Sequence, residues 1–244
     1  EAPIPPEAEA EERYQEALAA ITFYLGNAWL AKELEGVGGH DYLMLGGPDT
    51  DGPGDRSLRL FRTQALANSL HLASDVRGFG RFLASIRSRS MAEAVAELRA
   101  VNDIRSRGGD VELLDATRTL DKSPEAKFTL NGQQVWVEVK SKYRQQGSTF
   151  RASTVTNSLR KARAQLPAGG PGIVYLDLPS AWCDRREVLE GTNRAIEDSL
   201  RNTRRVSAVV VMLERRIFRP GEGVTFIHAN YAIVNPNPRT PLRG

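Results

Sequence analysis

The sequence predicts an α/β fold, in which a mixed central sheet is flanked by helices and preceded by an α-helical N-terminal module. Up to about residue 88, apolar residues recur at three- and four-residue steps, the spacing of amphipathic helices. After that point, strand-like segments alternate with helical ones, an order that gives a mixed sheet with helices on its faces. We therefore divide the 244 residues into a mobile tail (1–12), a helical module (13–88) and a sheet domain (89–244).

The N-terminal part is expected to be helical apart from its tail and one loop. Residues 1–12 are rich in Pro, Ala and Glu and have no packing pattern, which predicts a mobile tail. Residues 46–56 are rich in Gly, Pro and Asp, which favours a loop built from turns. Three helices are expected between and after these segments, over residues 13–34, 57–74 and 80–87.

The sheet domain begins with a helix over 90–107, for which Ser90 is the expected N-cap. Asn131-Gly132 lies between two strand-like runs and predicts a tight hairpin turn. Helical segments at 154–165 and 186–202 separate the third strand from the fourth and the fourth from the fifth, which predicts crossover connections. The expected strands cover residues 111–114, 127–130, 135–141, 173–178, 207–213 and 231–234.

Composition narrows the class of protein. The net charge is +3, and only six of the 33 basic residues are lysines, so arginine dominates. Arginine suits bidentate phosphate contacts, which favours an anionic polymer as partner, although a biased genomic base composition explains the arginines equally well. A single cysteine, Cys183, excludes an internal disulfide framework and a cysteine-built zinc site. No apolar run approaches membrane-spanning length and no secretory leader is visible, so we expect a cytoplasmic protein without a membrane partner.

Residues 135–142 are the most informative segment of the chain. Apolar residues alternate with a period of two, which indicates a strand. Valines occupy one face, and the other face carries Trp136, Glu138 and Lys140. A carboxylate and an ammonium on a largely buried strand are costly unless they are paired or bind an ion. The segment is therefore either a same-face ion pair on a half-exposed strand or part of a site.

Two further carboxylates are expected near this strand. Glu97 lies at the edge of the apolar stripe of its helix and points toward the sheet. Glu125 follows Pro124 at the start of the first hairpin strand, about as far from the turn as Glu138 is on the second. Converging carboxylates repel one another unless a cation lies among them, and hard oxygen ligands suit Mg²⁺ or Mn²⁺. With Lys140 beside them, the pattern predicts a metal-dependent phosphodiesterase.

Glu97, then Pro124-Glu125, then Glu138-Val139-Lys140 resemble the motif of the PD-(D/E)XK nuclease superfamily. The resemblance covers about residues 90–215 and implies a restriction-endonuclease-like (Holliday-junction-resolvase-like) fold with a helix–strand–hairpin–helix–strand core. It also implies Mg²⁺ (or Mn²⁺) as cofactor and nucleic acid, with DNA expected, as substrate.

The resemblance assigns roles residue by residue. Glu97, Glu125 and Glu138 would be metal ligands, while Glu125, Glu138, Lys140 and Gln165 would form the catalytic set. Glu125 departs from the family pattern, which usually has Asp, because its carboxylate is one methylene further from the backbone. Asp121 is an alternative ligand at this position.

Basic residues after the motif are candidate phosphate contacts, although a solvated helix face explains them as well. They are Arg144, Arg151, Arg160, Lys161 and Arg163.

Two other functions stay open. One is a catalytically impaired protein of the same fold that serves as a nucleic-acid-binding or protein-interaction module. The other places function in residues 13–88, which would bind a protein partner or a second copy of the chain.

Overall fold

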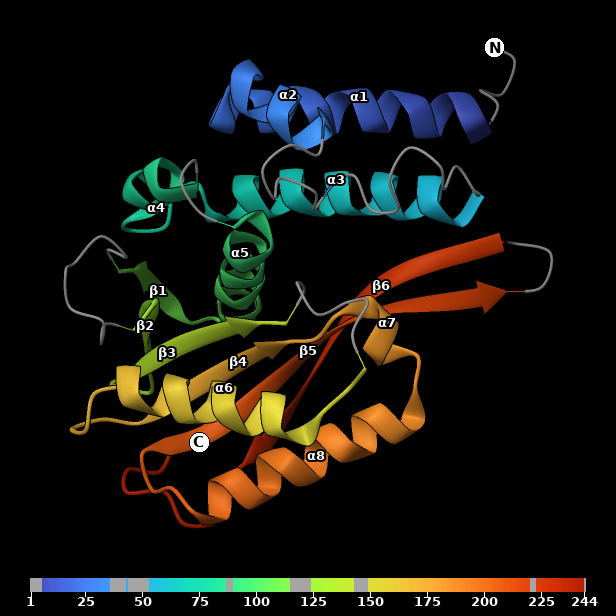
Figure 1. The fold of residues 1–244 in the computed structure, drawn as a ribbon. Helices are drawn as coiled ribbons and strands as arrows, with labels where there is room; N and C mark the ends of the chain where they lie inside the picture. The colour runs from blue at the N-terminus through green and yellow to red at the C-terminus, as the bar shows by residue number, and fades with distance from the viewer. Residues whose placement is uncertain are drawn as a thin grey trace.

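The computed structural model describes residues 6–35, 43, 53–86, 90–114, 124–142, 149–219 and 223–243. Six strands form one mixed sheet in sequence order, and helices cover both faces (Figure 1), so the predicted α/β class is confirmed. The strands are β1 (Asp110–Leu113), β2 (Ala126–Leu130), β3 (Gln133–Ser141), β4 (Gly172–Asp177), β5 (Val206–Arg219) and β6 (Gly223–Val234). The helices are α1 (Pro6–Leu25), α2 (Asn27–Glu35), α3 (Pro53–Ala73), α4 (Phe79–Ile86), α5 (Met91–Ser106), α6 (Ala152–Gln165), α7 (Ser180–Cys183) and α8 (Arg186–Arg201).

The connections decide the strand directions. The β1–β2 and β2–β3 pairs are antiparallel, whereas β4 is parallel to both β3 and β5 because α6 and α8 carry the chain back between them. β5 and β6 form a long antiparallel hairpin at the edge of the sheet. Among the described helices, none is both long enough and apolar enough to cross a membrane.

The turn between β2 and β3 has the predicted chemistry. Leu130 pairs with Gln133, so the loop consists of Asn131 and Gly132 alone. Both have positive φ, at 48° and 73°, which Asn and Gly tolerate best. The hairpin prediction is therefore confirmed, and this turn fixes the register of β2 against β3.

Two predictions for the N-terminal region are wrong. The tail predicted over 1–12 is helical from Pro6, because proline suits the first turn and Arg13 and Gln15 bond back to Glu9 and Glu11. The single helix predicted over 13–34 is two helices, since Gly26, at φ 88°, ends α1 in a left-handed conformation. Residues 1–5 lie outside the described part of the chain.

Other boundaries differ from the predictions as well. The loop expected over 46–56 ends earlier, because α3 starts at Pro53, and residues 46–52 are outside the described part. Ser90 occupies the predicted N-cap position, but its side chain makes no capping bond. The last two strands, expected over 207–213 and 231–234, are much longer. They continue to pair with each other beyond the point where β5 stops pairing with β4.

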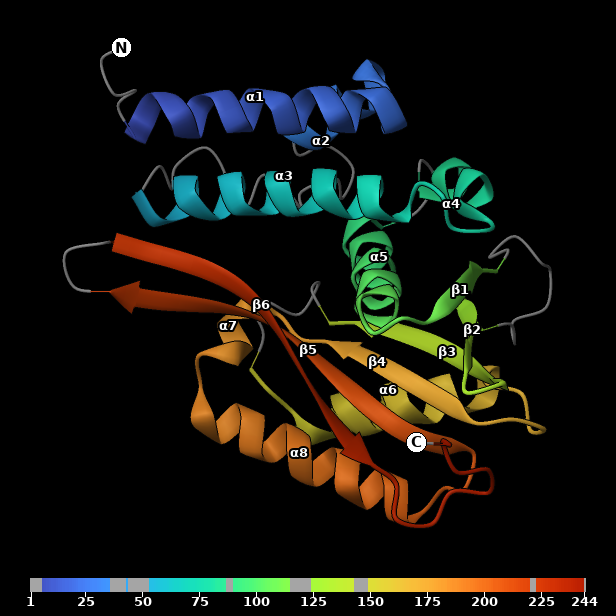
Figure 2. The same ribbon diagram turned by 180° about the vertical axis from the view of Figure 1, so that it is seen from behind.

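This long hairpin lies along α3 (Figures 1 and 2), where the ring of Phe61 stacks on that of Phe226 at 5.7 Å between centroids. The contact joins the N-terminal helices to the far edge of the sheet. Gly78, at φ 89°, makes a second contact with the sheet, because a Cβ there would lie 2.1 Å from the backbone oxygen of Leu113 in β1.

Each face of the sheet has its own apolar core. One core lies under α6 and α8 and includes Val174, Val209 and Trp182. The other lies under α5 and continues from the sheet into α1–α4, with Ile21, Leu70 and Val137 among its members. Because this second core crosses residue 88, the N-terminal helices and the sheet share their buried apolar surface.

Two buried ion pairs cross from the helices to this face of the sheet. Arg99 of α5 contacts Asp177 of β4 at 2.6 Å and also donates to the Leu213 backbone oxygen. Arg62 of α3 contacts Glu214 of β5 at 2.5 and 3.0 Å. Burial alone would raise the pKa of Glu214, but contacts from His228 and Arg62 hold it at about 2.

We expect Glu214→Gln to destabilise the protein by about 3–5 kcal/mol, because the buried Arg62 guanidinium would lose its counter-charge. The folded-state pKa of Glu214 is depressed, so its stabilisation is present above pH about 4.5 and is lost as the pH falls toward about 2. Urea unfolding from pH 7 down to pH 3 measures both effects.

The matched control is Asp198→Asn, which removes one partner of the exposed pair with Arg201. It should change stability little, since exposed ion pairs contribute about 0–1 kcal/mol. Equal losses from the two variants would contradict the role of the buried pair.

Candidate active site at the end of strand β3

The site exists because β3 is longer than its neighbour β2. The β2–β3 ladder begins at the pair Ala126–Val137, whereas β3 continues to Ser141 and pairs there with Asp177 of β4. Glu125 lies just before the ladder, and its backbone N–H donates to the Val137 oxygen at 3.0 Å. Within the described residues, the end of β3 therefore has no strand partner on the β2 side, and side chains from α5 and α6 lie near it.

A cavity of about 460 Å³ occupies this position. Polar side chains make up most of its wall, and acidic and basic groups are present in equal number. The lining residues are Glu93, Glu97, Glu125, Val139, Lys140, Ser141, Lys142, Thr154, Asn157, Ser158 and Lys161. Glu97, Glu125 and Lys140, which the sequence predicted to converge from a helix and two strands, thus line one cavity.

Glu138 lies beneath this cavity and is fully buried. Lys140 Nζ donates to its Oε1 at 2.5 Å, while Oε2 has no hydrogen-bond partner among the described residues. Burial raises the pKa of Glu138 to about 8; the Lys140 ammonium opposes this rise and the Glu125 charge adds to it. The predicted same-face contact between Glu138 and Lys140 is therefore present, and it lies on a buried strand rather than a half-exposed one. Because of the raised pKa, the contact is a full ion pair only above pH about 8.

The residue types fit a hard divalent cation, but their arrangement fits it only in part. Glu125 and Glu138 are close enough for their charges to interact, and the unpartnered Oε2 of Glu138 lacks the positive group that a dication would supply. In the described part of the chain, however, no three acidic, histidine or cysteine side chains already form a group that could hold a metal ion. Lys140 already contacts Oε1 of Glu138, one of the two oxygens that a cation could use.

Helix α6 supplies the wall opposite α5. One stripe of the helix, which includes Val155, Leu159 and Ala162, packs into the apolar core. A neighbouring stripe faces the cavity at intervals of three, one and three residues. It consists of Thr154, Asn157, Ser158 and Lys161.

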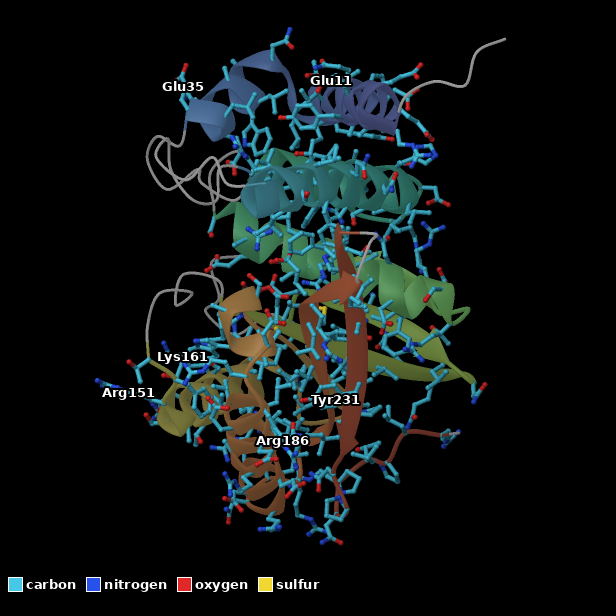
Figure 3. All side chains as sticks on the ribbon, turned by 90° about the vertical axis from the view of Figure 1, so that its right-hand side faces the viewer. Glu11, Glu35, Arg151, Lys161, Arg186 and Tyr231 are labelled. Atoms are coloured by element: carbon cyan, nitrogen blue, oxygen red, sulfur yellow. The ribbon has the colours of Figure 1, made fainter. Side chains whose placement is uncertain are left out.

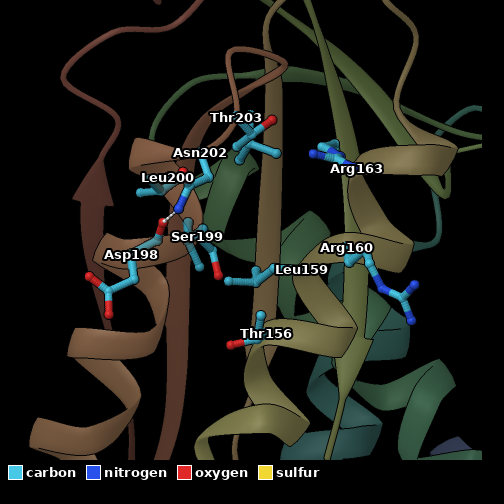
Figure 4. Close-up of a pocket in the computed structure, with 11 residues that line it drawn as sticks. Thr156, Leu159, Arg160, Arg163, Asp198, Ser199, Leu200, Asn202 and Thr203 are labelled. Carbon is cyan, nitrogen blue, oxygen red and sulfur yellow. Dashed lines mark hydrogen bonds between the residues drawn. The ribbon is translucent and has the colours of Figure 1, made fainter.

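The predicted basic residues of α6 are divided between two surfaces. Lys161 faces the cavity, whereas Arg160 and Arg163 line a separate groove of about 240 Å³ between α6 and α8 (Figure 4). Successive helical residues are about 100° apart, so neighbours in sequence point in different directions. Asp198 and Asn202 of α8 form the other wall of this groove.

The remaining predicted residues lie around the cavity. Arg151 is exposed at the N-cap position of α6, on the same side of the molecule as Lys161 (Figure 3). Gln165 is half-buried at the last turn of α6, one turn beyond Lys161, and does not line the cavity. Arg144 and the alternative ligand Asp121 lie outside the described residues.

Sequence reasoning missed several lining residues. Lys142 follows the Glu-Val-Lys run by two positions, so the period-two alternation of β3 could have placed it beside Lys140. Glu93 lies one helical turn before Glu97, so the same helical periodicity could have placed it beside Glu97. Asn157 and Ser158 carried no signal, because polar residues on a predicted amphipathic helix normally face solvent.

Comparison with known proteins identifies no relative: no family model, curated protein or solved structure matches this chain.

The stability of the protein should fall as the pH rises from about 4.5 to about 8. Glu138 has a raised folded-state pKa, so over this range the folded state retains a proton that the unfolded state loses, and folding becomes less favourable. Glu138→Gln should flatten this part of the curve. Denaturant unfolding of the wild type and of Glu138→Gln at pH 5, 7 and 9 measures this pH dependence. If the stability of both proteins changes equally with pH, Glu138 is not its source.

Proposed function

We propose that this protein is a metal-dependent nuclease that hydrolyses phosphodiester bonds, with DNA as the expected substrate. The observation that carries the proposal is the cavity where Glu97, Glu125 and Lys140 meet above the buried Glu138. Hydrolysis of an anionic ester needs oxygen ligands for a dication and a positive group for the charge that develops on phosphate. Both kinds of group come together here.

The order of the elements supports a restriction-endonuclease-like fold and membership of the PD-(D/E)XK superfamily. From α5 to β4 the chain forms a helix, three antiparallel strands, a second helix and a strand parallel to the third. Glu138-Val139-Lys140 lies on the third strand of this series, and Glu125 immediately precedes the second. These are the positions at which the resemblance expects the acidic residues and the lysine.

Each residue of the proposed site has its own role. Glu97, Glu125 and Glu138 would hold Mg²⁺ or Mn²⁺, which when bound polarises the phosphodiester and lowers the pKa of a bound water. Lys140 lies at the cavity wall with Nζ in contact with Glu138. From there its ammonium can orient the attacking water or neutralise charge on the phosphate oxygens. The longer side chain of Glu125, in place of Asp, suits a carboxylate that must reach across from the start of β2.

One observation favours a second candidate, a protein of this fold that binds nucleic acid or a protein partner without cutting. Lys140 already contacts Glu138, and the described acidic residues form no preassembled metal group. This candidate predicts nucleic-acid binding that depends on salt but not on Mg²⁺, with no cleavage products.

The full chain should cleave labelled DNA when Mg²⁺ or Mn²⁺ is added and should be inactive in EDTA. Glu138→Ala and Lys140→Ala should each lower the initial rate at least about 100-fold, because each removes a group that stabilises charge in the transition state. Duplex, junction, single-stranded DNA and RNA substrates, run side by side on denaturing gels, identify the preferred polymer.

Lys127→Gln is the matched control. This lysine lies on the neighbouring strand β2, pairs with Glu112 at 3.1 Å and does not line the cavity. Its rate should equal that of the wild type, and circular dichroism should show that all variants are folded. If the wild-type protein cuts none of these substrates with either metal, the nuclease proposal fails and the binding candidate remains.

A further inference from the structure

Three ammonium groups share the cavity. Lys140 and Lys142 lie at the end of β3, and Lys161 approaches from α6. They are close enough to interact: burial lowers the pKa of Lys142, the charges of Lys140 and Lys161 lower it further, and the Glu93 carboxylate opposes this shift. Three like charges around one space repel one another, and an anion bound between them would relieve that repulsion.

The lysines differ in their contacts. Among the described residues, Lys140 makes an ion pair, with Glu138, whereas neither Lys142 nor Lys161 lies within ion-pair distance of a carboxylate. The backbone N–H of Lys142 donates to the backbone oxygen of Asp177 at 2.8 Å, which fixes the position from which the Lys142 side chain extends. Lys161 is fixed by the packing of α6. The ammonium of Lys140 is therefore paired with Glu138, whereas those of Lys142 and Lys161 are positioned to contact a bound anion.

The wall near these two lysines carries hydrogen-bonding groups of the kind that bind tetrahedral anions. Thr154 and Asn157 lie on the same stripe of α6 as Lys161. Ser158 is on this stripe too, but its hydroxyl donates to the Thr154 backbone oxygen at 3.0 Å. Ammonium groups next to hydroxyl and amide donors suit phosphate oxygens. The volume of about 460 Å³ is within the range of small-ligand sites, so it has room for a phosphate together with part of its nucleotide.

The charges of the site lead to the same ligand. The three carboxylates that line the cavity (Glu93, Glu97 and Glu125) balance the charge of its three ammonium groups. A dication bound by the carboxylates would leave this set with a charge of +2. An anionic phosphate would reduce that charge in a partly buried space, whereas a neutral ligand would not.

We propose that Lys142 and Lys161 form a phosphate-binding subsite that holds a phosphate group of the nucleic-acid substrate beside the group of carboxylates. This inference rests on the proposed function. The two lysines bind and position the substrate, whereas Lys140 acts on the reacting phosphate.

The test is equilibrium binding, which needs no turnover. Fluorescence anisotropy measures the affinity of the full chain for single-stranded and duplex oligonucleotides in Ca²⁺ over a range of salt concentrations. Each lost phosphate contact should reduce the slope of log K against log salt by about 0.7 for single strands and about 0.9 for duplex. Lys142→Gln and Lys161→Gln should each show this reduction, and the double variant about twice as much.

Lys127→Gln is the matched control, because it removes one positive charge from a lysine on β2 that pairs with Glu112 and does not line the cavity. Its slope should stay at the wild-type value, and Lys161→Arg should restore most of the slope lost in Lys161→Gln. Oligonucleotides with a 5′-phosphate and with a 5′-hydroxyl distinguish an end phosphate from an internal one: only an end-binding subsite loses affinity with the hydroxyl form.

The outcomes separate this inference from the proposed function. If both glutamine variants keep the wild-type slope, or if no oligonucleotide binds at all, the subsite is wrong. If cleavage depends on Glu138 while the slopes are unchanged, the nuclease proposal stands and the subsite falls. If the slopes change as expected but no substrate is cut, the subsite stands and catalysis falls.

Discussion

The rest of the structure depends on how helix α5 is held against the sheet. Most side chains of α5 are buried, because α3 lies on one side of it and the sheet on the other (Figure 2). Its Arg99 is among the buried groups, and removing either partner of such an ion pair leaves a charge without compensation in a medium of low polarity. The pair with Asp177 therefore fixes the rotation and height of α5 over β4.

This constraint reaches the candidate site directly. Glu97 lies two residues before Arg99 on α5, and Ser141, which lines the cavity, donates to Asp177 at 3.2 Å. Asp177 thus contacts both the helix that carries Glu97 and the strand that carries Lys140. A single buried carboxylate therefore contacts two of the elements that line the cavity, and burial raises its pKa.

The electrostatic state of Glu138 is the other feature that shapes the site. A fully buried carboxyl with one oxygen bonded to Lys140 and the other unpartnered is poorly stabilised as an anion. The single positive charge of Lys140 does not offset the effect of burial on this carboxyl. A dication beside it would stabilise the carboxylate form further. The same carboxyl therefore opposes stability at high pH and favours the binding of a cation, as expected where a functional group is kept at the expense of folding.

The sequence by itself determined the order of the strands, the Asn131-Gly132 turn and the contact between Glu138 and Lys140, because these follow from local periodicity, turn chemistry and positions two residues apart on one strand. The length of the β5–β6 hairpin and the division of Arg160, Lys161 and Arg163 between two surfaces came only from the tertiary structure. Both depend on which neighbours pack against a strand or a helix, and such long-range contacts leave no local pattern in the chain.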